Sequence, residues 1–387
     1  MLEEEGLLAA FYTDSSARSP LGRCMRRLGG LTPKFGALDR WDVKGVPAQK
    51  IRSSDLPGLY EKIIRLARPS IPPIEVFRRR HQLLSGKMKR WGTRDANMVY
   101  SMFHENLDFI RYAKSRGALS VVDVYVSPLT ERVMAEEIER FPDWGDRADP
   151  KAERVLNELW DETAELGDVL LCPSEWVADG VRERTPAAAP KIKVVPYGCT
   201  MDFEGRTNQP TPGRVLFAGR DPLRKGLRHL ASAATNLKRT HPNIDARVAG
   251  FMPEQVARHP LCADLNFLGQ LDRASLREEF LSADVFVLPA LSEGFAGVVA
   301  EAIGAGCPVI VTKEAGSPVV DGREGLIVPV GDPDALTAAI ERLTTDRALR
   351  ERCAAECLKQ VPFYSGAAWR QRLTAALLEA DAARAAG

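Results

Sequence analysis

Short apolar runs rich in β-branched residues recur along the C-terminal half of the chain and alternate with helix-like stretches. Between these runs, residues 227–240 and 275–283 carry apolar and small side chains at helical spacing. Strands alternating with helices indicate βαβ units and therefore a parallel sheet covered on both faces. Such sheets bind ligands where the carboxyl ends of their strands converge. The predicted strands are 214–219, 246–250, 266–269, 284–289, 308–312 and 325–329.

The N-terminal half follows the same pattern less regularly. Its predicted strands are 97–103, 119–127, 168–174 and 192–198, and its predicted helices are 106–116, 130–141 and 150–165. A length of 387 residues suits two domains rather than one core. The polar, proline-containing stretch 207–213 is typical of a linker, and 367–386 is an alanine-rich helix candidate. We therefore predict domains at 1–206 and 214–360, joined by 207–213, with a C-terminal helical segment 361–387 that packs back on the N-terminal domain.

The composition excludes several classes of protein. No apolar run reaches the roughly 18–20 residues that cross a bilayer, and the acidic start MLEEEG has the wrong charge order for a secretory signal. We expect a cytoplasmic protein that is soluble or peripheral to the membrane. The seven cysteines are scattered without a Cys-x-x-Cys pair, which favours neither a disulfide framework nor a zinc site.

The net charge of +1 conceals a strongly basic segment. Residues 15–95 hold 19 Lys and Arg against 6 Asp and Glu. Such an excess suggests an anionic partner. In residues 75–91 basic and apolar side chains interleave, which suggests a helix lying on an anionic lipid surface, with 23–30 as a second candidate contact. The alternative is a solvated face whose charges pair with acids elsewhere in the fold. Nucleic acid is not expected, because no recognised binding motif accompanies the charge.

The stretch VLFAGRDPLRKG (215–226) gathers positive charge at the end of a strand. The predicted strand ends at Gly219, Arg220 follows directly, and Lys225 stands where the next helix begins. Fixed cations, free backbone N–H groups and the positive end of a helix dipole together suit a diphosphate.

A second stretch, LSEGFAGVVAEAIGAGCPVIV (291–311), supplies a pair of carboxylates. Glu293 falls in a strand-to-helix loop, and Glu301 falls inside the following helix, with seven residues between them. Gly294 lets the backbone approach a ligand closely. Carboxylates accept hydrogen bonds from vicinal hydroxyls, so the pair suits one acid for each of two sugar rings.

These motifs resemble the large family 4 (group 1) of retaining GT-B glycosyltransferases. The resemblance extends over residues 194–345, through VVPYG, GRDPLRKG, NFLGQL, the 291–311 stretch and GLIVPVGDPDAL. It implies two Rossmann-like domains whose parallel sheets face each other across a cleft. It also implies a nucleotide-sugar donor in the C-terminal domain and a glycan, lipid-linked or other hydroxyl acceptor.

By the same resemblance, Arg220 and Lys225 hold the donor diphosphate beside Gly219. Glu293 contacts the donor sugar, Glu301 holds the ribose, and the backbone at Gly294 and Phe295 completes the phosphate site. The expected catalytic residues are Glu293, Arg220 and Lys225. The resemblance also implies that the acceptor attacks the donor sugar on the same face that the diphosphate leaves. Neither a metal nor another cofactor is expected, because the two cations supply the charge that stabilises the leaving group.

The chain departs from the family pattern in two places. Residues 1–14 resemble the end of a first helix followed by a second strand, so we expect the usual first strand to be missing, through a late start codon or a truncated copy. The usual acceptor-side histidine is also absent from 120–128, which leaves His104 and Asp123 as acceptor-side candidates.

Two alternatives stay open at this point. One is an inactive nucleotide-sugar-binding module, and the other is a GT-B sugar-nucleotide epimerase. A phosphorylase is disfavoured, because no lysine for pyridoxal phosphate is identifiable.

Overall fold

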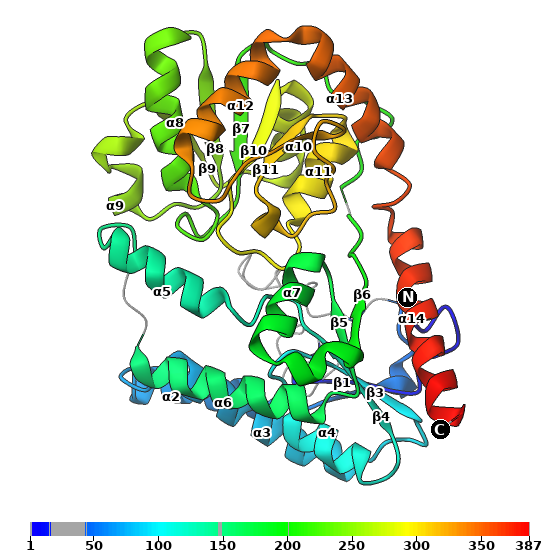
Figure 1. The fold of residues 1–387 in the computed structure, drawn as a ribbon. Coiled ribbons are helices and arrows are strands. Elements are labelled where there is room, and N and C mark those ends of the chain that lie inside the picture. The colour runs from blue at the N-terminus through cyan, green and yellow to red at the C-terminus, as the bar shows by residue number, and fades with distance from the viewer. Residues whose placement is uncertain are drawn as a thin grey trace, which may run out of the picture. The chain divides into compact units, whose positions relative to one another are not determined.

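The computed structural model describes residues 2–14, 16, 43, 45–145, 149–199 and 201–386. The chain divides into two compact units, each combining parallel strands with helices (Figure 1). The first unit comprises Met1–Asp123, Ala148–Leu171 and Thr374–Gly387, and the second comprises Val124–Arg147 and Cys172–Leu373. No boundary between these two units falls within residues 207–213. The domain boundaries predicted from the sequence remain a prediction.

The first unit is built on parallel pairings. Strand β1 pairs with β2, and β3, β4 and β5 pair in that order. Val121 and Val122 of β4 and Leu170 of β5 are completely buried, as expected for strands covered on both faces. The strands are β1 (Phe11–Thr13), β2 (Ile51–Ser53), β3 (Met98–Met102), β4 (Leu119–Asp123) and β5 (Val169–Cys172), and the helices are α2 (Leu56–Ala67), α3 (Pro73–Trp91), α4 (Leu107–Lys114) and α6 (Pro150–Leu166).

The second unit is built around a parallel sheet in the order β12-β11-β10-β7-β8-β9. The strands of this sheet are β7 (Arg214–Ala218), β8 (Asp245–Ala249), β9 (Leu265–Gly269), β10 (Val285–Leu288), β11 (Val309–Val311) and β12 (Gly325–Ile327), and the unit also holds β6 (Ile192–Val194), which lies outside it. Its helices are α5 (Thr130–Arg140), α7 (Glu175–Arg184), α8 (Leu227–Thr240), α9 (Glu254–Ala257), α10 (Arg273–Ser282), α11 (Gly297–Ala305), α12 (Pro333–Thr345) and α13 (Arg347–Gln360). Helix α14 (Gly366–Ala386) runs from the second unit into the first.

Local chemistry sets where the helices of the second unit begin and end. The Asp332 carboxylate accepts a hydrogen bond from the N–H of Ala335, which caps α12. Helix α11 ends at Gly306, whose positive φ of 79° suits glycine. Gly226 precedes α8 with a φ of 73°, and a Cβ there would lie 1.9 Å from the carbonyl oxygen of Pro289. Only glycine lets the start of α8 pack this closely against the chain leaving β10.

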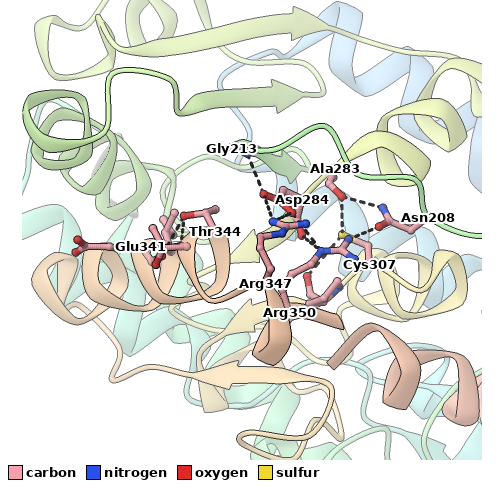
Figure 2. Close-up of polar contacts among 12 residues, drawn as sticks. Asn208, Gly213, Ala283, Asp284, Cys307, Glu341, Thr344, Arg347 and Arg350 are labelled. Atoms are coloured by element: carbon pink, nitrogen blue, oxygen red, sulfur yellow. Dashed lines mark hydrogen bonds and ion pairs between the residues drawn. The ribbon is translucent and has the colours of Figure 1, made fainter. Parts of the chain in front are cut away.

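A buried carboxylate ties the start of β10 to α13 (Figure 2). Asp284 is fully buried; it accepts hydrogen bonds from Arg347 at 2.7 and 2.9 Å, from Arg350 at 3.2 Å and from the N–H of Gly213 at 2.9 Å. Arg350 also donates to the side-chain oxygen of Asn208. The predicted linker 207–213 is therefore anchored to the second unit at both ends.

The predicted strands and helices are present, and most differ from the prediction by a few residues at their ends. The largest differences are the predicted strands 192–198 and 119–127, which each end four residues early, at Val194 of β6 and at Asp123 of β4. Beyond Asp123 the backbone carbonyl of Tyr125 lies against Gly294 instead of continuing the sheet. Within the described ranges, no helix is both long enough and apolar enough to cross a bilayer.

Candidate functional site

The loop between β7 and α8 brings two of the predicted donor residues together. Gly219 follows β7, and the Lys225 side chain runs directly past it. A Cβ built on Gly219 would lie 2.3 Å from Cδ of Lys225, so glycine leaves the space that this lysine occupies. Arg220 is exposed, and it has no hydrogen bond or ion pair with any residue that the structure describes. Its guanidinium is thus available to a ligand.

The Lys225 ammonium forms an ion pair with Glu293, the carboxylate predicted to contact the donor sugar. Its Nζ lies 2.5 Å from Oε1 of Glu293, whose side chain is only 10% exposed. Strands β7 and β10 are neighbours in the sheet, so the loops that follow them meet at one edge. The two motifs, 68 residues apart in sequence, form a single cluster.

Arg224 is a member of this cluster that the sequence analysis missed. Its Nη1 lies 2.9 Å from the same Oε1 of Glu293, and its Nε donates to Asp221 at 2.7 Å. Burial lowers the pKa of Arg224, but the charge of Glu293 and the bond to Asp221 outweigh burial and raise that pKa overall. The sequence carries no signal that separates Arg224 from the other cations of this loop.

The loop after β10 is held by its backbone. Ser174 donates its hydroxyl to the carbonyl of Gly294 at 2.7 Å, and a Cβ on Gly294 would lie 1.6 Å from the Tyr125 carbonyl oxygen. The Phe295 ring packs edge-on to Tyr197, with centroids 5.7 Å apart. Among the described residues, no acceptor faces the backbone N–H of Gly294 or of Phe295. These N–H groups belong to the loop that leads into α11, just before its N-cap Ala296, and anions bind near such helix N-termini.

Glu301 lies in the second turn of α11 and is half-buried. Burial raises its carboxyl pKa, an effect that the charge of Arg273 partly offsets. No described residue forms a hydrogen bond or an ion pair with Glu301. A half-buried carboxyl without a protein partner suits the hydroxyls of a ligand.

The two acceptor-side candidates lie at the carboxyl ends of neighbouring strands in the first unit. Asp123 ends β4; it is buried and accepts a hydrogen bond from the Tyr100 hydroxyl. Burial and the charge of Asp123 raise the pKa of Tyr100, so this phenol stays protonated. His104 follows β3 in a left-handed conformation, and burial lowers its pKa to about 3. The His104 imidazole is therefore neutral at physiological pH.

The basic segment is partly neutralised inside the first unit. Arg78 pairs with Glu158 at 2.9 Å, and Arg80 pairs with Glu61 at 3.0 Å. Helix α3 matches the predicted helix 75–91, but its apolar side chains Val76, Leu84 and Met88 are buried rather than presented to a surface. The stretch 23–30 lies outside the described residues. Across the described chain, no group of three or more His, Cys, Asp and Glu side chains is placed to hold a metal.

Comparison with solved structures defines the fold. Sucrose-phosphate synthase from Thermosynechococcus elongatus aligns with a TM-score of 0.61 at 17% identity, covering 97% of each chain. HepE from Anabaena, solved with UDP, aligns with a TM-score of 0.60 at 15% identity, covering 95% of this chain and 99% of HepE. The protein has the GT-B fold of these structures, as the sequence predicted.

Sequence comparison defines the family of the matched segment. Residues 202–360 match the family described as glycosyl transferases group 1. Glycogen synthase from Mycobacterium tuberculosis is 27% identical over 61% of this chain and 59% of its own length. Phosphatidyl-myo-inositol mannosyltransferase from Mycolicibacterium smegmatis is 34% identical over 49% and 47%. The chain thus spans about half to three-fifths of these relatives. Residues 202–360 therefore resemble the group 1 glycosyltransferases, and the predicted resemblance is confirmed.

Proposed function

We propose that the protein is a retaining glycosyltransferase that moves a sugar from a nucleoside-diphosphate donor to a hydroxyl acceptor. The observation that carries this proposal is the cluster in which Lys225 and Arg224 meet Glu293 beside an unpaired Arg220. HepE, which shares the fold, was solved with UDP. This supports a nucleotide donor without deciding the base.

The proposed roles follow from charge. Cleavage of a sugar–phosphate bond leaves negative charge on the diphosphate and positive charge on the sugar. Arg220 and Lys225 stabilise the leaving diphosphate, together with the free N–H groups of Gly294 and Phe295. Glu293, freed in part from Lys225 as the diphosphate arrives, accepts hydrogen bonds from the donor sugar. Glu301 accepts them from the ribose.

No metal has a role in this scheme. A divalent cation neutralises a diphosphate in many transferases. Here the cations of the β7–α8 loop occupy that role. We therefore expect turnover in the presence of a chelator.

The stereochemical proposal is tested by following the product. The protein is incubated with UDP-, GDP- and ADP-sugars and a panel of glycan and lipid-linked acceptors, and proton NMR reports the anomeric configuration before any mutarotation. Retained configuration with release of nucleoside diphosphate supports the proposal. Inverted product contradicts the retaining assignment while leaving transfer intact.

The two alternatives make different predictions. An inactive binding module holds a nucleotide sugar but releases no diphosphate with any acceptor. An epimerase converts its nucleotide sugar without an acceptor. The family match and the Glu293 cluster favour transfer over both.

We also propose that the protein docks at an anionic membrane, on the cytoplasmic face, through α2. Leu56, Leu59, Ile63 and Leu66 are spaced along one side of this helix and are 46%, 47%, 52% and 86% exposed. Lys62 borders one edge of that stripe on the helical wheel, and Arg65 lies further round the helix, paired with Glu61 at 2.9 Å. Helix α2 packs on α3, from which Arg80 reaches Glu61. An apolar stripe with a cation along one edge suits a helix lying in an anionic lipid surface.

Vesicle sedimentation tests this docking. The double variant Leu59→Ser/Ile63→Ser is expected to lower partition onto phosphatidylglycerol vesicles at least tenfold, because each exposed aliphatic side chain adds on the order of 1 kcal/mol when buried. The matched control is Leu378→Ser on α14, where the leucine is 53% exposed. Equal partition of all three proteins, or no partition of the native protein, contradicts the proposal.

A further inference from the structure

A cavity of about 190 Å³ opens within the first unit, apart from the cluster around Glu293. Its walls come from α3, from residues 104–108 after β3, and from α6. A single water needs only roughly 10–15 Å³ of such space. The cavity therefore has room for a small molecule or for one ring of a larger one.

Two buried polar atoms in the cavity wall have no hydrogen-bond partner within the described structure. They are Oγ of Ser85, a residue that is only 1% exposed, and Nε2 of His104. Beside them, Nδ1 of His81 lies 3.3 Å from the side-chain oxygen of Asn106. Buried polar groups are almost always satisfied, because leaving one unpaired costs about 1–3 kcal/mol. The cavity presents hydrogen-bonding capacity that a ligand can use.

The backbone is strained where it positions these groups. His104 and Asn106 both have positive φ, at 64° and 53°. This region is uncommon for residues other than glycine, and such strain persists where the surroundings enforce it, often at binding sites. Here the strain turns the His104 side chain into the wall of the cavity.

The charges that line the cavity indicate what class of ligand it accepts. The lining carries one cation, Arg78, which is paired with Glu158, and two further carboxylates, Asp108 and Glu162. Arg111 pairs with both of these carboxylates from outside the lining. Burial lowers the pKa values of both His81 and His104, so their imidazoles are neutral. The lining offers no unpaired cation to hold a phosphate, whereas neutral imidazoles, hydroxyls and amides match the hydroxyls of a sugar.

We propose that this cavity binds an uncharged, polyhydroxylated ring, a sugar or a cyclitol, through Ser85 and His104. Resting on the proposed transferase function, we assign that ring to the acceptor. The part of the acceptor that enters this cavity is then an uncharged sugar or cyclitol ring. Any phosphate on the acceptor lies outside the cavity.

Saturation-transfer NMR on the full chain tests the proposal. The probes are glucose, mannose, galactose and myo-inositol, with glucose 6-phosphate as the anionic counterpart. At least one neutral probe is expected to bind. Ser85→Ala and His104→Asn, the latter chosen because asparagine tolerates a positive φ, are each expected to weaken that binding about 3- to 10-fold through one lost hydrogen bond. The control Ser115→Ala removes an exposed hydroxyl and is expected to change nothing.

Three outcomes overturn the assignment: no neutral probe binds, glucose 6-phosphate binds in preference, or neither substitution weakens binding. Calorimetric titration with nucleotide sugars is run in parallel. If nucleotide sugars bind but neutral rings do not, the cavity assignment fails and the transferase proposal survives. If rings bind and nucleotide sugars do not, the transferase proposal fails and the cavity stands as a sugar site.

Discussion

A methyl group placed on Gly219 is expected to weaken donor binding by displacing Lys225. The new Cβ would lie 2.3 Å from Cδ and 2.8 Å from Cε of Lys225. Ordinary contact begins near 3.4 Å, so the lysine chain must move by about 1 Å or more. A charge-assisted hydrogen bond contributes about 1.5–3 kcal/mol, and about 1.4 kcal/mol is a factor of ten in affinity. Gly219→Ala should therefore raise the donor Kd about 10- to 100-fold. Thermal unfolding should change little, because the displaced atoms belong to a flexible side chain.

A double-mutant cycle isolates the mechanism. Donor Kd values are measured by calorimetry for the native protein, Gly219→Ala, Lys225→Ala and the double variant. Lys225→Ala removes the atoms that the methyl group would strike. Gly219→Ala should therefore have no further effect in that background. If it weakens binding equally in both backgrounds, the glycine acts through its own approach to the ligand, and the reasoning from Lys225 is refuted.

Three further predictions concern single residues. Glu301→Gln should weaken donor binding several-fold at pH 7.5. Burial raises the Glu301 pKa above 4.5, so the donor affinity of the native protein should fall as the pH drops through that raised pKa. The glutamine variant, titrated with donor across the acid range, should lack this pH dependence. Asp284→Ala leaves Arg350 buried without its counter-charge and should lower the free energy of unfolding in urea by about 3–5 kcal/mol, whereas an unchanged midpoint would show the ion pair to be dispensable. Gly294→Ala places a methyl 1.6 Å from the Tyr125 carbonyl oxygen, and since backbone cannot swing aside we expect a loss of about 1–3 kcal/mol; native-like stability would mean that this contact is not kept in solution.

The sheets were predictable because their strands are buried on both faces. All four residues of β10 are completely buried, and such a run leaves few alternatives to a central parallel strand. The order of the sheet was not predictable, because β8 and β9 lie between β7 and β10 in sequence but not in space. That order is what joins Lys225 to Glu293.

The missed features depend on packing that periodicity does not reveal. Arg224 turns inward through a loop whose Asp221 has a φ of 64°, and no pattern of charges indicates which cation of the loop does so. The sequence assigned the lipid-facing role to residues 75–91, whereas burial leaves the exposed apolar stripe on α2. The cavity at His104 needs α6, which lies some fifty residues further along the chain.

The most direct test of the proposed donor site is calorimetric titration with UDP-, GDP- and ADP-sugars. The native chain is compared with Arg220→Ala/Lys225→Ala, after circular dichroism has shown that both are folded. We expect saturable binding of one nucleotide class by the native protein, and loss of that binding in the double variant. A folded native protein that binds none of the three would contradict the donor site and, with it, the proposed transferase.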